Sequence, residues 1–195
     1  MNYSAKEIIQ RVKTAKNFKE IPAGFWICGI RTSEDTPDAF DDVFYLMKGD
    51  KIIVETTGTT HPGKAVLIGG FRKYNKKGAA VVVSNTWYNR VWKKGKHKGI
   101  YKALVQTGAK IDVYRDGNAD AKVDATGTIY SGFFGINFHL SGKNPLKNLI
   151  KKLIGYWSAG CQVCNVYKDY RKIIKYIFES DQEFISYVIV DEFSI

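Results

Sequence analysis

The sequence predicts an α+β fold that is rich in β-strands and has flanking helices. Short β-branched and aromatic runs, separated by turn-forming residues, follow one another through the middle of the chain, a pattern typical of β-sheets. Helical periodicity is confined to a segment near the N-terminus and two segments in the last quarter. Hydrophobic residues make up 45% of the 195 residues, which is enough apolar surface for a substantial core.

The first expected element is a helix that begins after Ser4. Ser4 and Glu7 form a capping-box pattern, and apolar residues continue at helical spacing as far as Ala15. After Pro22, short strands are expected at 25–30, 43–47 and 51–57. A tight turn joins the last two strands into a hairpin, and polar loops are expected at 32–42 and 56–63.

The second half of the chain continues the β-rich pattern. Strands are expected at 79–83, 100–106, 110–114, 133–139 and 184–190, and helices at 146–154 and 169–178. The last helix is amphipathic. The chain contains no internal repeat, low-complexity tract or linker, so we expect a single domain that spans residues 1–195.

The charge predicts an anionic partner. The net charge is +11, with 30 Lys and Arg against 19 Asp and Glu, which favours nucleic acid, an anionic cell wall or a membrane surface. Solubility alone is the alternative explanation. No apolar run is long enough to span a membrane, and residues 1–20 lack the apolar region of a signal peptide. We therefore expect synthesis in the cytoplasm without a signal peptide.

Two residues 22 positions apart, His139 and Cys161, suggest acyl-transfer chemistry. Three cysteines cannot all pair, and reduced thiols are the simplest interpretation. A thiol becomes a nucleophile when a base deprotonates it, and small residues before Cys161 place backbone N–H groups near a developing oxyanion. Strand alternation puts His139 on the same face as Asn137, opposite Ile136 and Phe138.

The same segment also allows other interpretations. Cys161 and Cys164 form a Cys-x-x-Cys pattern, which occurs in redox pairs and zinc sites, but the chain supplies no further ligands at zinc spacing. A small buried residue is the simpler role for Cys164. Asp116, Asn118 and Asp120 resemble the start of a calcium loop. An acidic turn between strands is the plainer interpretation, so no metal or other cofactor is expected.

The blocks Gly135–His139 and Ser158–Gln162 together resemble the active-site signature of the L,D-transpeptidase catalytic-domain superfamily. They are most similar to a phage and prophage branch whose cysteine motif reads Ser-x-Gly-Cys-Gln. Further blocks that resemble this branch are Thr59–Gly63, Gly95–Gly99, Ala103–Gln106 and Tyr114–Asp116, with Asn118 and Asp120. The resemblance covers residues 56–165.

The resemblance implies a β-sandwich or barrel core at about 43–166, with the N-terminal helix and the C-terminal helix and strand packed on it. It also implies a Cys161 nucleophile, a His139 base and an oxyanion site at the N–H groups of Gly160 and Cys161. It places Ser158, Trp157 and His97 around the substrate, and it gives Gln162 one of two roles, to orient the substrate or to orient the cysteine loop. From the residues alone, His97 is expected in an exposed basic loop and His61 is expected to be exposed. Contact with substrate carboxylates is the alternative for each.

The chain departs from the better-known members, because Ala159 stands where they carry a second histidine and Val163 where they carry Arg or Asn. These departures favour a phage-type cell-wall peptide hydrolase that acts on peptidoglycan stem peptides through a Cys161 thioester. Cross-linking of stem peptides by transpeptidation is an alternative. A non-catalytic basic protein of the virion, or one that binds nucleic acid, is another. Such a hydrolase would reach the cell wall after release or as part of a phage particle.

Overall fold

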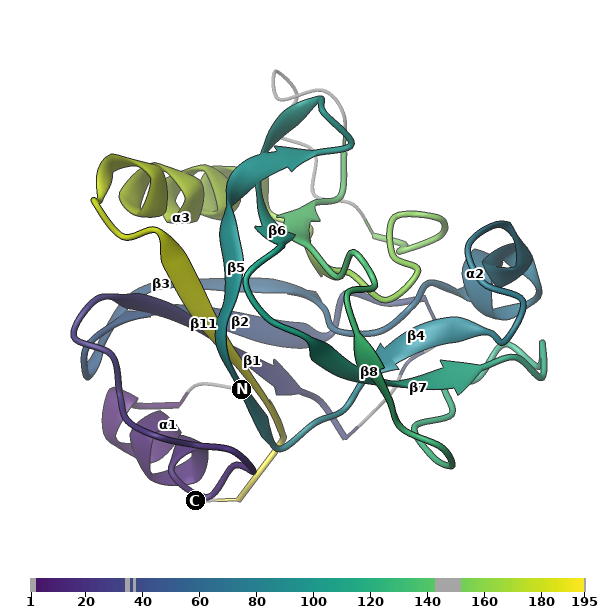
Figure 1. The fold of residues 1–195 in the computed structure, drawn as a ribbon, viewed down its shortest axis with the longest axis horizontal. Helices are drawn as coiled ribbons and strands as arrows, with labels where there is room; N and C mark the ends of the chain where they lie inside the picture. Colours follow the sequence, from purple (N-terminus) through teal and green to yellow (C-terminus); the bar gives the residue numbers. More distant parts are fainter. Residues whose placement is uncertain (1–2, 34–35, 37, 143–151, 195) are drawn as a thin grey trace.

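The structure is a computed structural model that describes residues 3–33, 36, 38–142 and 152–194. Within these residues, eight strands form a closed barrel, three strands form a small sheet, and helices flank them (Figure 1). The predicted α+β, β-rich fold with flanking helices is therefore confirmed. The small sheet and α2 lie on one side of the barrel, and α3 and α1 lie at its opposite ends (Figure 1).

The barrel closes through strands that lie far apart in the sequence. Its spatial order is β1 (Phe25–Arg31), β11 (Phe184–Asp191), β5 (Thr86–His97), β6 (Tyr101–Gln106), β9 (Phe138–Leu140), β10 (Gln162–Cys164), β3 (Lys51–Thr59) and β2 (Asp42–Lys48), which pairs with β1. The small sheet contains β4 (Ala79–Val82), β7 (Ile111–Asp116) and β8 (Tyr130–Gly132). The helices are α1 (Ala5–Val12), α2 (Lys64–Leu67) and α3 (Tyr167–Glu179), with a 3₁₀ turn at Gly70–Lys73.

The main core lies inside the barrel and under α3. Trp92 stacks on Tyr187 with ring centroids 4.6 Å apart, and Phe138 packs against Trp92. The amphipathic α3 buries Ile173 and Ile177 against this cluster. Residues of β4 and β7 belong to the same cluster, so the small sheet is packed on the barrel through shared apolar contacts.

A second core lies between α1 and the outer face of the barrel. The predicted capping box is present, because the Glu7 N–H donates to the Ser4 hydroxyl and the Ser4 N–H donates to the Glu7 carboxylate. The helix ends earlier than its apolar pattern predicts, at Val12, which is buried. Ala15 lies beyond the helix but stays in the same core.

The described elements differ from the predicted ones in several places. The twelve-residue β5 was not expected; its pairing with β11 shifts register near Arg90, which has a left-handed φ of 52°, and this bulge interrupts the alternation that marks a strand. The strand expected at 133–139 is regular only from Phe138. The helix expected at 146–154 lies mostly outside the described residues, and Leu153 forms an isolated bridge with Ala39 instead.

Two adjacent strands bring the predicted active-site residues together. β9 and β10 pair in parallel, with His139 opposite Val163, and Cys161 immediately precedes β10. Ile136 and Phe138 are buried in the main core, whereas Asn137 and His139 line a pocket. The predicted alternation of this segment is therefore confirmed, and it turns the polar residues toward the pocket.

Candidate active site

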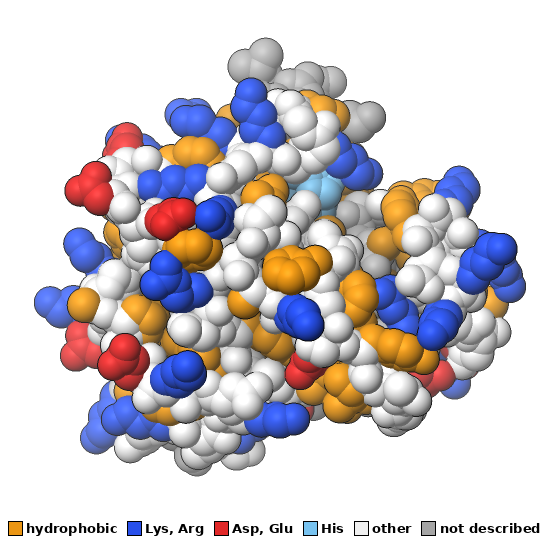
Figure 2. Space-filling view, viewed as in Figure 1, with side chains coloured by type: hydrophobic (Ala, Val, Ile, Leu, Met, Phe, Trp, Pro, Cys, Tyr) orange, Lys and Arg blue, Asp and Glu red, His pale blue; other side chains and the backbone are white. Residues whose placement is uncertain are grey.

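A pocket of about 400 Å³ lies where the barrel meets the small sheet, and both Cys161 and His139 line it. His97, Asn137 and Trp157 also contribute to its wall. Figure 2 shows a histidine in a hollow of the molecular surface, with hydrophobic side chains across from it. Of the residues that the sequence predicts for the site, the pocket thus collects four: Cys161, His139, His97 and Trp157.

The hydrogen bonds of His139 determine which of its ring nitrogens is basic. Nδ1 lies 3.0 Å from the Leu140 carbonyl oxygen and 3.2 Å from the Tyr101 hydroxyl. The Tyr101 hydroxyl donates its own proton to the same carbonyl, at 2.9 Å. Because a carbonyl only accepts, Nδ1 carries the proton and Nε2 carries the lone pair. Nε2 is buried and has no hydrogen-bond partner among the described residues.

Cys161 is partly exposed, and its sulfur is held beside the chain that leads into β9. Its thiol donates to the Gly135 carbonyl at 3.4 Å, and its Sγ accepts from the Asn137 N–H at 3.5 Å. No hydrogen bond joins Sγ to His139 Nε2 within the described part of the chain. The two groups share one pocket, but the thiol points to a different acceptor.

Burial keeps both groups neutral at pH 7. Although the Cys161 side chain is partly exposed, desolvation by the surrounding atoms raises its pKa to about 11, and the Asn137 N–H and the charge of Lys98 oppose this shift. Burial also lowers the pKa of His139 to about 3, with further contributions from His97 and Lys98. The resting pair is therefore a thiol and a neutral imidazole. These two pKa values disfavour proton transfer in the resting pair, so the imidazole can act only as a base in the transition state, while sulfur attacks the substrate.

Two residues that were expected at the substrate are fully buried instead. The Ser158 hydroxyl donates to the Cys161 carbonyl at 2.9 Å. The Gln162 side chain donates to the Gly160 carbonyl at 3.1 Å and accepts from the Tyr187 hydroxyl at 2.6 Å. For Ser158 the prediction of substrate contact is wrong, because its hydroxyl bonds to the backbone of the cysteine loop. For Gln162 the loop-orienting alternative agrees with the hydrogen bonds, because its side chain bonds to Gly160 and Tyr187. Their role is to hold that loop.

Gly160 also differs from its predicted role. It has a φ of 127°, and a Cβ at this position would lie 2.5 Å from the Ala80 carbonyl oxygen, so this close packing requires glycine. Its N–H donates to the Ser158 hydroxyl at 3.1 Å. This N–H is therefore not available to an oxyanion. The N–H of Cys161 donates to none of the described residues.

Asn137 and Tyr101 are site residues that sequence reasoning did not select. Asn137 contributes its N–H to Cys161 Sγ and its carbonyl to the Gln162 N–H at 2.9 Å. Strand alternation places Asn137 on the same face as His139, and this pattern could have selected it from the sequence. Tyr101 comes from β6, and nothing in the local sequence indicates that its hydroxyl reaches His139.

The other candidate residues are placed as follows. His97 ends β5 and is half-buried, so the expected exposed loop is wrong. His61 is buried, contrary to the expectation that it is exposed. Cys164 lies in the main core, as predicted for a small buried residue. It is a free thiol, as are Cys28 and Cys161.

The acidic segment after β7 is held by its own hydrogen bonds. The Asp124 N–H donates to Asp116, and the Asn118 side-chain amide donates to the Asp124 carboxylate at 2.7 Å. Across residues 3–33, 36, 38–142 and 152–194, no three His, Cys, Asp or Glu side chains are grouped to hold a metal ion. The acidic-turn interpretation describes what these side chains do in the structure.

Acid should destabilise the fold through His139. Its pKa is lowered from 6.5 to about 3 in the folded protein, so the unfolded chain takes up the proton first as pH falls below 6.5. We expect this residue alone to reduce the free energy of unfolding by about 2 kcal/mol between pH 7 and pH 5. Urea unfolding of the wild type and of His139→Gln at both pH values measures the difference. Equal losses in the two proteins would contradict it.

Comparisons with protein-family models, with curated proteins and with solved structures found no match to this chain. None of the described helices is long and apolar enough to cross a membrane. The geometry of the pocket is therefore the main observation on which a function can be argued.

Proposed function

We propose that this protein is a Cys–His acyl-transfer enzyme that cleaves peptidoglycan stem peptides, with Cys161 as nucleophile and His139 as base. The observation that carries the proposal is the buried His139 Nε2. The Leu140 carbonyl and the Tyr101 hydroxyl hold the proton on Nδ1, and Nε2 keeps a free lone pair beside a pocket that also contains a partly exposed thiol. A buried acceptor without a partner is costly in a fold, and a base awaiting a proton explains it.

The proposed reaction begins when the Cys161 thiol leaves the Gly135 carbonyl and turns to Nε2 of His139. Sulfur attacks the peptide carbonyl carbon, while the thiol proton moves to Nε2. The tetrahedral intermediate collapses when the imidazolium returns that proton to the leaving amine, and an acyl-thioester remains on Cys161. Water, deprotonated by the same imidazole, then attacks the thioester carbonyl carbon. The C–S bond breaks, the acid leaves, and the imidazolium returns the proton to Cys161 Sγ.

Water is the acceptor that we favour over an amine. The substrate class and this preference rest on the sequence resemblance, in particular on its phage-type motif and on Ala159 in place of a second histidine. The excess of 11 positive charges suits an anionic cell wall. Such an enzyme would meet its substrate after release from the cell or within a phage particle.

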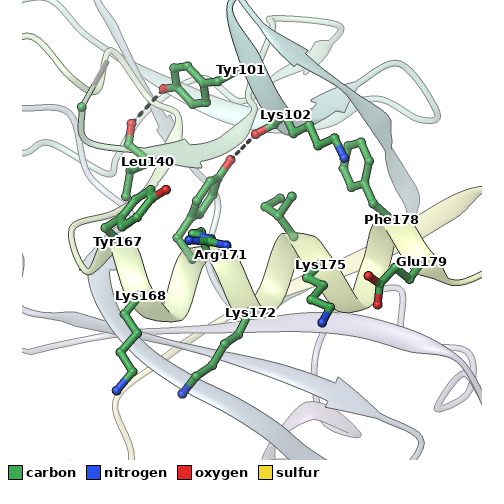
Figure 3. Close-up of a pocket in the computed structure, with 13 residues that line it drawn as sticks. Tyr101, Lys102, Leu140, Tyr167, Lys168, Arg171, Lys172, Lys175, Phe178 and Glu179 are labelled. Carbon is green, nitrogen blue, oxygen red and sulfur yellow. Dashed lines mark hydrogen bonds between the residues drawn. The ribbon is translucent and has the colours of Figure 1, made fainter. Parts of the chain in front are cut away.

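A second groove favours one alternative, a basic binding protein without catalysis. A cavity of about 750 Å³ runs along α3 (Figure 3). Its lining includes five cationic side chains and one carboxylate, Glu179; the cationic residues are Lys102, Lys168, Arg171, Lys172 and Lys175. In Figure 3, Lys168 and Lys172 extend away from Tyr101 and Lys102. This charge distribution fits an anionic polymer such as a cell-wall polymer or a nucleic acid.

Incubation with purified muropeptides, followed by mass analysis of the products, tests the proposal. Hydrolysis adds one water to the cleaved peptide, and transpeptidation joins two stem peptides. We expect the hydrolysed product. The cross-linked product would contradict hydrolysis and support the alternative function, transpeptidation. Unchanged muropeptides, together with retained binding to the cell wall or to nucleic acid, would favour the binding protein.

A further inference from the structure

In the proposed reaction, the oxyanion that forms on the substrate has too few hydrogen-bond donors around it. When sulfur attacks a carbonyl, the carbonyl oxygen becomes an oxyanion, and enzymes stabilise it with preorganised hydrogen-bond donors. The Gly160 N–H is occupied by the Ser158 hydroxyl, at 3.1 Å. Of the two expected donors, only the N–H of Cys161 remains free of described partners. A second donor must come from another element of the pocket.

His97 lines the pocket, and a chain of hydrogen bonds fixes its tautomer. The Gln106 N–H donates to Asn137 Oδ1 at 3.0 Å, which fixes which end of that amide is oxygen. The Asn137 NH₂ group therefore faces His97, with Nδ2 3.3 Å from Nδ1. Because an amide NH₂ group only donates, Nδ1 of His97 accepts, and its ring proton lies on Nε2.

His97 and His139 thus carry opposite tautomers in neighbouring rings. The two rings stack with centroids 3.8 Å apart and planes 21° from parallel, and both line the pocket. Burial, together with the charge of Lys98, lowers the pKa of His97 to about 4, so this ring is also neutral at pH 7. One ring offers a lone pair at Nε2, and the other offers an N–H at Nε2.

We propose that His97 is a second catalytic residue, which donates a hydrogen bond from Nε2–H to the substrate oxygen that becomes negatively charged. This inference rests on the proposed acyl-transfer function. Neutral imidazole is suited to this role, since other enzymes polarise a carbonyl with a neutral histidine whose pKa is lowered. The role also explains why a polar side chain and a backbone N–H are committed to fixing one tautomer.

The bonds and protons balance without an extra reactant. The S–C bond forms as the carbonyl π pair moves to oxygen, and the thiol proton moves to His139. On collapse, the oxygen lone pair restores the C=O bond, the C–N bond breaks, and the amine takes the proton from His139. His97 keeps its own proton throughout, and only its hydrogen bond strengthens.

Two probes separate this role from a general effect on the thiol. Iodoacetamide alkylates Cys161 by displacement at carbon and forms no oxyanion, whereas a phenyl thioester of an N-acetylated amino acid acylates it through an oxyanion. In His97→Phe, which retains a flat ring for the stack, we expect acylation to slow by about 10²–10³-fold and alkylation to change little. His97→Gln keeps an N–H donor and should recover part of the loss.

Equal loss of acylation and alkylation in His97→Phe would overturn the inference, as would unchanged acylation. A wild-type protein that is alkylated but not acylated would instead refute the proposed acyl-transfer function. Nitrogen-15 NMR of the imidazoles gives a readout that needs no activity. We expect the proton of His97 on Nε2 and that of His139 on Nδ1; a proton on Nδ1 of His97 would also overturn the inference.

Asn137→Asp provides the matched change, because a carboxylate is nearly isosteric but cannot donate to Nδ1 of His97. We expect this variant to move the His97 proton to Nδ1 and to slow acylation as His97→Phe does. An unchanged tautomer in Asn137→Asp would contradict the assignment of Asn137 as the residue that positions His97.

Discussion

Replacing Cys161 with alanine is expected to abolish muropeptide cleavage. The reaction that we propose forms a covalent bond to Sγ, and no other thiol lines the pocket in the described part of the chain, because Cys28 and Cys164 are buried in the two cores. The side chain is partly exposed and its hydrogen bonds are long, at 3.4 and 3.5 Å. The fold should therefore tolerate the change.

Cys164→Ala is the matched control for this loss. It removes a thiol three residues away that faces the core, so it should lower stability while leaving the specific activity of the folded protein largely intact. Cleavage is measured as product per folded protein, with circular dichroism to establish the folded fraction. Equal cleavage by wild type and Cys161→Ala would remove the basis for the proposed chemistry.

Replacing His139 with glutamine is expected to reduce kcat/KM by about 10²–10⁴-fold at pH 7, the usual contribution of a positioned base. The pKa of the Cys161 thiol gives an independent estimate of the activity that remains without the base. With a pKa of about 11, about one Cys161 side chain in 10⁴ is a thiolate at pH 7. Without the base, only this fraction reacts. Glutamine retains a donor for the Leu140 carbonyl, so the loss of kcat/KM should reflect the removal of the basic Nε2 atom.

The pH dependence of the residual activity of His139→Gln tests the role of the base more sharply than the size of the activity loss does. Below a thiol pKa of about 11, thiolate increases about tenfold per pH unit, and the residual activity of the variant should rise accordingly from pH 7 to 9. The wild type should stay nearly flat, because the pKa of His139 is about 3 and the base is already neutral. Parallel profiles for the two proteins would exclude His139 as the base.

Local patterns were sufficient to predict most of the fold. Alternation and turn residues located the hairpin of β2 and β3, and apolar spacing located α3. They did not reveal β5, because the bulge at Arg90 breaks the alternation. Local patterns also did not predict that the parallel pairing of β1 and β11 closes the barrel. That pairing joins segments more than 150 residues apart, and no local sequence pattern indicates it.

The candidate site shows the same division. A histidine on the polar face of a strand and a cysteine after small residues could be selected from sequence, and both line one pocket. The assignment of Ser158 to the substrate was wrong, and the sequence left two roles open for Gln162. The same polar atoms can bind a ligand or the backbone, and only burial decides between them. The roles of Tyr101 and Asn137 depend on tertiary hydrogen bonds that the local sequence does not indicate.

Mass spectrometry of the intact protein, mixed rapidly with muropeptides and quenched in acid, detects whether Cys161 carries an acyl group during turnover. We expect a transient mass increase equal to the acyl part of the stem peptide. Digestion should locate it on the peptide that contains Cys161, and hydroxylamine should remove it, as expected for a thioester. Turnover of muropeptides without any such adduct, or an adduct confined to Cys28 or Cys164, would contradict the claim that Cys161 carries the acyl group.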